Sequence, residues 1–289
     1  MTEDNSFFMA FKEHLLMFLR GLIMGIADII PGVSAGTMAL ITGIYERLIF
    51  AIDGINRFFV KHIFKLNFRK LRRDYKKIDF AVFIPVLLGI AIALFSLAHL
   101  MDYLLLEWTS ITYAFFFGLI LASAVFVFQK ADGNRSRGFF YLIIGFVFAF
   151  WFSGLKALDA NHSLPILFAS AAIAICATIL PGISGSFMMV LLNQYETVIA
   201  SLKNLWFDNL IVLVLGAIVG ALAFSRLLNF LLKKYKSETM FFLTGLMLGS
   251  LRLPYDKIVT AGNHYLFAVI AAVIGFAIVF VLEKNFNKH

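Results

Sequence analysis

Long runs of apolar residues, separated by short charged segments, dominate this chain. They cover residues 15–52, 80–106, 111–128, 139–158, 164–202, 210–232, 240–253 and 265–282. Several approach the ~20 residues that a helix needs to cross a bilayer. Because lipid offers the backbone no hydrogen-bond partners, such runs satisfy their own polar groups as helices. With 61% hydrophobic and 15% charged residues, the sequence predicts an all-α polytopic membrane protein.

Composition excludes several other classes of protein. The net charge of +8 comes from Lys and Arg gathered in loops, which indicates cytoplasmic loops rather than nucleic-acid binding. The single cysteine, Cys176, excludes a disulfide framework, and the mixed-charge segment 1–13 does not resemble a signal peptide. The scattered histidines and the lack of a Walker loop predict no metal, no ATP and no other cofactor.

Two of the apolar runs are interrupted by copies of one motif. The first copy spans 31–36 (PGVSAG) and the second spans 181–186 (PGISGS), 150 residues later, and each is followed by Tyr-Glu. Weaker matches follow at an offset of 127, because the first half carries an extra basic loop; they pair Gly89 with Gly216 and Gly118 with Gly245. We therefore predict two homologous membrane repeats, 1–160 and 161–289, each with one broken segment followed by three spans.

The basic loops predict the topology. Lys and Arg gather in 53–79, 130–137, 233–236 and the C-terminal tail, and these four segments share the cytoplasmic side only if each motif segment is a hairpin. The hairpins, 15–52 and 164–202, then begin at opposite faces of inverted halves, with both termini inside. The arm from 37 to 52 has 16 residues, or about 24 Å, which is shorter than the ~30 Å bilayer core. Re-entrant hairpins are therefore favoured. Hairpins whose two arms both cross the bilayer remain the alternative.

The hairpin tips are typical of an anion-binding site. Backbone N–H groups at the start of the second arm, with the helix dipole, attract a phosphate or carboxylate. A single Pro-Gly-x-Ser could equally be a turn with a helix cap, but two copies in inverted halves favour ligand binding. The candidate residues are Pro31, Gly32, Ser34, Gly36, Thr37, Pro181, Gly182, Ser184, Gly185 and Ser186.

Four charged residues are further candidates. Asp28 is an acid in an apolar run, so it could take up a proton during transport, orient a cation, or bind the loop backbone. Glu46 and Glu196 are coupling candidates or interfacial anchors. Arg226 lies near the cytoplasmic end of its span, where it could contact a phosphate or snorkel to the surface.

The segment 24–37 (MGIADIIPGVSAGT), with 44–46 (IYE) and 180–186 (LPGISGS), resembles a bacterial membrane family identified as undecaprenyl-phosphate (polyprenyl-phosphate) translocases. The resemblance covers nearly the whole chain. It implies a multi-pass flippase in the bacterial cytoplasmic membrane that recycles a lipid carrier for cell-wall polymers. Its partners would be a polyprenyl-phosphate lipid and bilayer lipids, and alternating access, with proton coupling as an option, would move the lipid without ATP.

The motifs are also similar to those of undecaprenyl-pyrophosphate phosphatases. Where that family has Glu, His and Arg, this chain has Asp28, Thr37 and Gly185. Phosphoryl transfer depends on positive charge that stabilises its transition state, so we expect binding without cleavage and no catalytic residue. A phosphatase-like enzyme and a transporter of small organic anions remain alternatives, and the sequence leaves a homodimer open.

Overall fold

The computed structural model describes residues 3–29, 33–63, 79–155, 160–262 and 264–286, and every element in these ranges is a helix. The first half contains α1 (Glu3–Ile29), α2 (Ala35–Ile41), α3 (Tyr45–Ile63), α5 (Phe80–Glu107), α6 (Thr109–Lys130) and α7 (Arg135–Phe152). The second contains α8 (Leu164–Ile179), α9 (Gly185–Leu191), α10 (Tyr195–Asn204), α11 (Phe207–Lys234), α12 (Lys236–Ser250), α13 (Arg252–Ala261) and α14 (Tyr265–Phe286). The all-helical prediction is confirmed for these residues.

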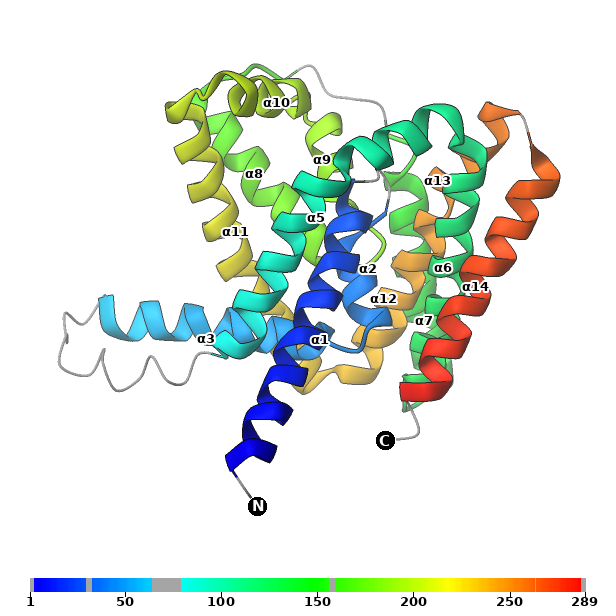
Figure 1. The fold of residues 1–289 in the computed structure, drawn as a ribbon, viewed down its shortest axis with the longest axis horizontal. Helices are drawn as coiled ribbons and strands as arrows, with labels where there is room; N and C mark the ends of the chain where they lie inside the picture. Colours follow the sequence, from blue (N-terminus) through cyan, green and yellow to red (C-terminus); the bar gives the residue numbers. More distant parts are fainter. Residues whose placement is uncertain (1–2, 30–32, 64–78, 156–159, 263, 287–289) are drawn as a thin grey trace.

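Each half begins with the same three-part element. A helix (α1 or α8) runs into the molecule, a seven-residue helix (α2 or α9) turns back, and an amphipathic helix (α3 or α10) follows. In Figure 1, α3 lies across the lower end of the molecule, near both termini, and α10 lies across the upper end. The two hairpins therefore begin at opposite ends and meet inside the molecule.

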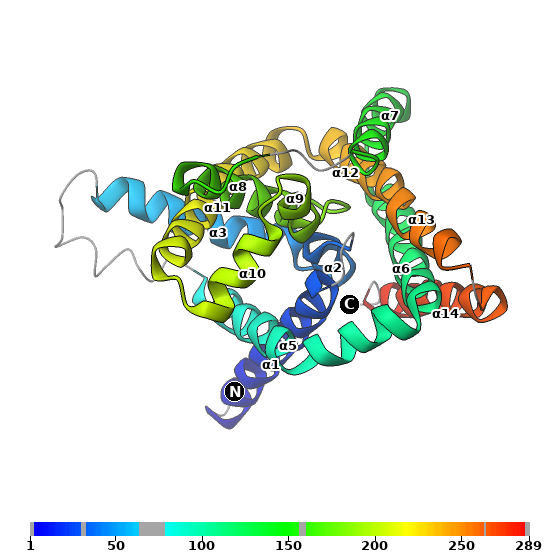
Figure 2. The same cartoon turned by 90° about the horizontal axis from the view of Figure 1, so that it is seen from above.

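The short helices occupy the interior. Seen from above, α2 and α9 lie inside a ring of longer helices (Figure 2). Val33 and Ile183, one from each tip, are buried in the same hydrophobic core, which also includes Leu243 and Leu246 of α12. Six of the seven residues of α2 are buried. The motif segments are therefore the centre of the fold rather than surface turns.

The first long helix of each half packs on its neighbour through a glycine. A Cβ at Gly89 of α5 would lie 2.2 Å from the carbonyl oxygen of Phe18 in α1. A Cβ at Gly216 of α11 would lie 2.4 Å from the carbonyl oxygen of Phe168 in α8. Glycine lets the two helix backbones approach closely, as in other membrane bundles. Gly89 and Gly216 were matched by sequence alone, and each contacts a residue at the corresponding position of its own half.

A second pair of glycines joins one half to the other. A Cβ at Gly118 of α6 would lie 1.9 Å from the carbonyl oxygen of Ala272 in α14, and one at Gly245 of α12 would lie 2.1 Å from that of Leu142 in α7. Both contacts run between halves, so α6 packs on α14 and α12 packs on α7. Because these contacts leave no room for a side chain, the two halves form one tightly packed bundle.

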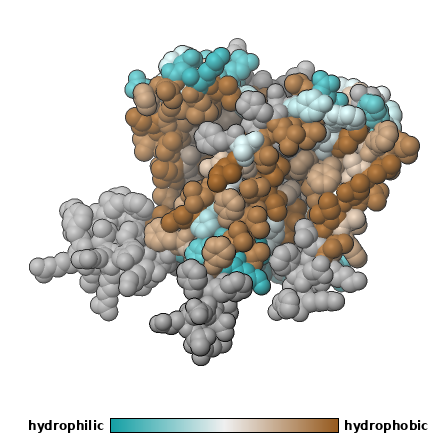
Figure 3. Space-filling model, in the orientation of Figure 1, coloured by the Kyte–Doolittle hydropathy of each residue, from teal (hydrophilic) through white to brown (hydrophobic). Residues whose placement is uncertain are grey.

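Exposed apolar side chains form a belt on the outer helices, α5, α7, α11 and α14 among them. Figure 3 shows hydrophobic residues over the middle of the molecule and hydrophilic ones along the upper edge and below the belt. Among the described residues, three helices are long and apolar enough to cross a membrane, namely α6, α7 and α11. Helix α8 and parts of α5 and α14 are shorter apolar segments. The chain is therefore built as a membrane protein.

Two predicted boundaries are wrong. The expected helical arm from 37 to 52 is broken: α2 ends at Ile41 and α3 begins at Tyr45, because Gly43 turns the chain with a φ of +73°. The predicted basic loop 53–79 is in part helical, since α3 continues to Ile63, and 64–78 lies outside the described residues. The returning arm is therefore shorter than predicted, with seven residues, or about 10 Å.

Candidate functional site

The two predicted tips are helix caps in the structure. Ser34 caps α2, and its Oγ accepts a hydrogen bond from Gly36 N at 3.1 Å. Ser184 caps α9, and its Oγ accepts one from Phe187 N at 3.4 Å. Serine is favoured at such positions because its hydroxyl satisfies an amide that the helix leaves unpaired. Pro31 and Gly32 lie outside the described residues.

The tips bind each other directly. Ser34 Oγ donates to the carbonyl oxygen of Leu180 at 2.8 Å. Thr37 Oγ1 accepts from Gly182 N at 2.9 Å across 145 residues of sequence. Both hydroxyl groups are buried. In this conformation Ser34 and Thr37 therefore hold one hairpin against the other.

Glycine makes this close contact possible. A Cβ at Gly36 would lie 2.5 Å from the carbonyl oxygen of Ile179, and one at Gly185 would lie 2.0 Å from Thr178 Oγ1. Gly182 has a φ of +88°, which side chains rarely tolerate, and lies against the backbone of Leu246. At these three positions the structure leaves no space for a larger residue.

The second tip borders a very small hollow. Ser184 Oγ and Ser186 Oγ form a hydrogen bond of 2.8 Å. The hollow beside Gly182 and Ser184 has a volume of about 10 Å³, which accommodates about one water molecule. Pro181 is buried at the same tip. The described tip residues are thus brought together, but this hollow is too small for a phosphate.

A much larger cavity lies beside the first tip. Its volume is about 480 Å³, and its walls come from α1, α2, α3, α5, α8 and α11. Most of the lining is apolar, including Ile49 and Ile52 of α3, Val86 of α5 and Ile218 of α11. This size is typical of a small-molecule site. Gly36 lines the cavity as well, so the cavity reaches the tip contact.

Two polar groups in this cavity have no hydrogen-bond partner. Asp28 Oδ1 and the Tyr45 hydroxyl are both buried and unpaired among the described residues. By contrast, the nearby Thr178 hydroxyl donates to the carbonyl oxygen of Ala174. Buried polar groups are nearly always satisfied in proteins, so an unpaired carboxylate and phenol in one cavity indicate a ligand. Asp28, singled out in the sequence as an acid in an apolar run, lines this apolar cavity.

Sequence reasoning did not identify Tyr45 as a site residue. It considered each Tyr-Glu pair as an interfacial anchor or, through its glutamate, as a coupling candidate. The structure instead leaves Tyr45 2% exposed, whereas Tyr195, its counterpart in the second half, is 40% exposed. The recurrence of tyrosine after each motif was a signal. Nothing in the sequence distinguished the buried copy from the exposed one.

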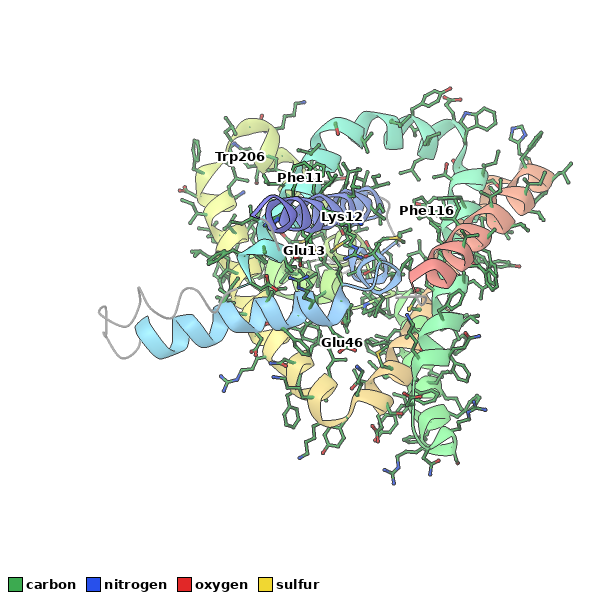
Figure 4. The ribbon with its side chains drawn as sticks, turned by 60° about the horizontal axis from the view of Figure 1, so that its bottom comes forward. Phe11, Lys12, Glu13, Glu46, Phe116 and Trp206 are labelled. Carbon is green, nitrogen blue, oxygen red and sulfur yellow. The ribbon has the colours of Figure 1, made fainter. Side chains whose placement is uncertain are left out.

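Glu46 and Glu196 lie at opposite ends of the molecule. Glu46 forms an ion pair with Lys236 at the start of α12, with 2.7 Å between Oε1 and Nζ; Figure 4 shows Glu46 where α3 begins. Glu196, in the first turn of α10, is exposed. Neither lines the large cavity, so neither is placed with Asp28.

Arg47 joins the start of α3 to two other segments. Its guanidinium binds Glu13 of α1 at 2.6 Å and Asp79, which precedes α5, at 3.0 Å. Burial alone would lower the pKa of Arg47, but the hydrogen bonds to both carboxylates raise it. This ion-pair network fixes α3 at the end of the molecule that carries the N-terminus.

Arg226 lines a separate cavity, most of whose lining residues are charged or carry an amide. That cavity has a volume of about 420 Å³ and lies between α3 and α11. At the offset of 127 between the halves, the counterpart of Arg226 is His99, whose side chain lies outside the described side chains. Among the described residues, no group of three or more His, Cys, Asp or Glu is placed to hold a metal ion.

The family of the chain is decided by a match over most of its length. A family model described as undecaprenyl phosphate translocase-like matches residues 24–266. The chain belongs to this family. The resemblance drawn from the two motifs is therefore confirmed.

Two curated relatives of the chain are both named polyprenyl-phosphate transporter. A polyprenyl-phosphate transporter from Vibrio cholerae serotype O1 is 39% identical over 239 residues, which cover 83% of this chain and 77% of that protein. A polyprenyl-phosphate transporter from Staphylococcus aureus is 30% identical over 284 residues, which cover 92% of this chain and 95% of that protein. No solved structure matches the chain.

Proposed function

We propose that this chain is a flippase that moves undecaprenyl phosphate, a polyprenyl-phosphate lipid carrier, across the bacterial cytoplasmic membrane. The observation that carries the proposal is the cavity of about 480 Å³, which is apolar except for a few groups such as Asp28 and Tyr45. An isoprenoid chain needs such apolar walls. A small soluble organic anion would leave them in contact with water, which disfavours that alternative.

The arrangement of the halves supports alternating access. The hairpins begin at opposite ends, and helices matched by sequence make corresponding contacts within and between the halves. We infer that the halves are inverted repeats with both termini in the cytoplasm, as the basic loops indicate. The tip contact between Ser34 and Leu180 then lies where one half would move against the other.

Asp28 is the residue on which we expect transport to depend. Its unpaired oxygen lies in the cavity, beside the first tip. A carboxylate there repels a phosphate when ionised and can donate a hydrogen bond to it when protonated. Proton uptake by Asp28 would therefore favour lipid binding. The tip glycines and hydroxyls, Gly182 and Ser184 among them, would contact the phosphate once the tips separate.

Hydrolysis is not part of this proposal. A phosphatase of the similar family has an arginine where this chain has Gly185, and a Cβ here would already lie 2.0 Å from Thr178 Oγ1. The position corresponding to its histidine is Thr37, which binds the opposite tip. A site that binds the phosphate but lacks this arginine and this histidine is suited to transport without cleavage.

Reconstituted protein provides the test. Liposomes that contain the protein and a fluorescent polyprenyl phosphate would be treated with a membrane-impermeant reductant, which quenches only the outer leaflet. We expect complete quenching with the wild-type protein and quenching of about half the lipid with empty liposomes.

Variants make this test specific. Asp28→Ala should behave like empty liposomes, whereas Gly54→Ala, at a position with no atom near its added Cβ, should behave like the wild type. The proposal would be contradicted if the fraction of lipid quenched in wild-type liposomes were no greater than in liposomes with the Asp28→Ala variant. Release of phosphate from undecaprenyl pyrophosphate by the purified protein would instead favour the enzyme.

A further inference from the structure

A second cavity is lined by two of the helices that line the first, α3 and α11, at the end of the molecule that carries the termini. It has a volume of about 420 Å³ and lies between α3 and the last part of α11. It is lined by Asp53, Arg226, Asn229, Phe230, Lys233 and Lys234. It shares none of its residues with the tips or with the apolar cavity. Its chemistry is therefore distinct from that of the site described above.

One face of α11 lines both cavities. Ile218 and Leu222 line the apolar cavity, and Arg226, Asn229 and Lys233 line the second one. These residues are three or four positions apart, so they form a single stripe along the helix. Leu222 and Arg226 are about one turn, or ~5.4 Å, apart along the axis. The lining thus changes from apolar to basic within one helical turn.

Helix α3 borders both cavities at the same level, since Ile52 and Ile55 line the apolar one on either side of Asp53, which lines the basic one. Asp53 and Asn229 are buried, and the carboxylate of Asp53 accepts a hydrogen bond from Asn229 Nδ2. This bond ties α3 to α11, the two helices that line both cavities.

The second cavity attracts anions. Arg226, Lys233 and Lys234 contribute three positive charges against the one negative charge of Asp53. No carboxylate of the described residues forms an ion pair with any of these three cations. Lys233 Nζ lies 5.3 Å from the centre of the Phe50 ring and so stays close to α3. Asn229 Oδ1 is buried without a partner, which leaves an acceptor for a ligand hydroxyl.

We propose that this basic cavity is a docking site for the phosphomonoester head group of a lipid whose chain lies in the apolar cavity. The inference rests on the proposed function and adds to it a second phosphate position, at the molecular end that carries both termini. Arg226 would bind the phosphate with its planar fork, and Lys233 would add a point charge. The protonated phosphate oxygen would donate to Asn229 Oδ1.

Binding measurements with three probes test this site. Purified full-length protein would be titrated with undecaprenyl phosphate, with undecaprenol, which lacks the phosphate, and with inorganic phosphate, and the bound fraction measured by native mass spectrometry. The test variant is Arg226→Gln/Lys233→Gln. The matched control is Lys203→Gln, which removes an exposed lysine at the opposite end of the molecule.

We expect the double variant to bind undecaprenyl phosphate about tenfold or more weakly, because it loses two charge-assisted contacts. It should bind undecaprenol as the wild type does, and Lys203→Gln should bind both lipids normally. Melting temperatures would verify folding, and Lys233→Gln/Lys234→Gln would replace the double variant if it fails to fold.

Three results would overturn the inference. The first is that the double variant keeps wild-type affinity for undecaprenyl phosphate, and the second is that it loses affinity for undecaprenol to the same extent. The third is that inorganic phosphate displaces the lipid at equal concentration, which would identify a site for free anions. Loss of binding in Asp28→Ala but not in the double variant would refute this inference alone. A wild-type protein that does not bind undecaprenyl phosphate would refute the proposed function too.

Discussion

Asp28 places a carboxylate oxygen in an apolar cavity where no described residue hydrogen-bonds to it. Such a group destabilises the fold, since burial removes its water without providing a partner. Groups that are retained despite this effect are typical of functional positions in membranes. The hydroxyl of Tyr45 is likewise a buried polar group without a hydrogen-bond partner, in the same cavity.

Replacing Asp28 should therefore separate stability from transport. We expect Asp28→Leu to increase the free energy of unfolding by about 1–3 kcal/mol, because an unsatisfied polar group is removed, and to abolish lipid movement. Thermal melting of the purified protein and the leaflet-quenching assay would measure the two effects. A variant that melts lower than the wild type would show that Asp28 is stabilised by a partner.

Thr37 should act mainly through the tip contact. Thr37→Val keeps the shape of the side chain but leaves Gly182 N without its acceptor, so we expect a loss of about 1–3 kcal/mol of stability. Thr37→Ser retains the hydroxyl and should lose much less. Equal melting temperatures for Val and Ser at this position would mean that the hydrogen bond contributes nothing.

Sequence reasoning identified most of these residues but not all of their contacts. Asp28 was singled out because an acid is rare in an apolar run. Ser34 and Thr37 were assigned to a ligand, whereas their hydroxyls bind the backbone of the other tip. That pairing joins segments about 145 residues apart, and only the folded arrangement of two separate hairpins reveals it.

At the scale of elements, the hairpins depend on helices α2 and α9, which have seven residues each. Helices this short are unstable in isolation, so tertiary contacts must keep them folded. For α2 the decisive contact is with the end of α8, where Gly36 lies against the carbonyl oxygen of Ile179. Overpacking at this point should separate the hairpins.

Gly36→Ala tests this contact. Its Cβ would lie 2.5 Å from a backbone oxygen that cannot move away as a side chain can, so we expect a destabilisation of about 1–3 kcal/mol. Gly54→Ala, within α3, meets nothing and should be neutral or slightly stabilising. The pair would be compared by melting temperature in the same detergent. Identical behaviour would exclude close packing as the role of Gly36.

The sequence predicted the elements well where apolar runs were long, and less well at the returning arms. The run 37–52 is mostly apolar on both sides of Glu46 and Arg47, so average hydropathy did not reveal the break between α2 and α3. The turn at Gly43 was the local signal. The basic residues after position 53 were read as a loop because charge was expected to mark loops, although α3 continues to Ile63.

At the scale of the whole molecule, the matched glycines support a common origin of the two halves. Gly89 and Gly216 contact corresponding residues, Phe18 and Phe168, in their own halves. The motif offset and the positions of the basic loops predicted both the repeat and its inversion. The tight contacts of α6 with α14 and of α7 with α12 could not be predicted, since packing partners leave no trace in hydropathy.

Cysteine labelling tests the inversion. In a Cys176→Ala background, Lys203→Cys on α10 should react with a membrane-impermeant maleimide in intact cells. Asp132→Cys, between α6 and α7, should react only after the membrane is permeabilised. Both positions are exposed, so a lack of reaction reports sidedness rather than burial. Reaction of both in intact cells would refute the cytoplasmic position of the basic loops.

The size of the apolar cavity has a consequence for substrate range. At about 480 Å³, it matches a drug-sized molecule, whereas an undecaprenyl chain has eleven isoprene units and is considerably larger. Most of the chain must therefore stay outside the protein, in the bilayer, while the head-proximal units are enclosed. A protein that encloses only those units cannot measure total chain length. It should transport polyprenyl phosphates of different lengths at similar rates and discriminate only among their first few units.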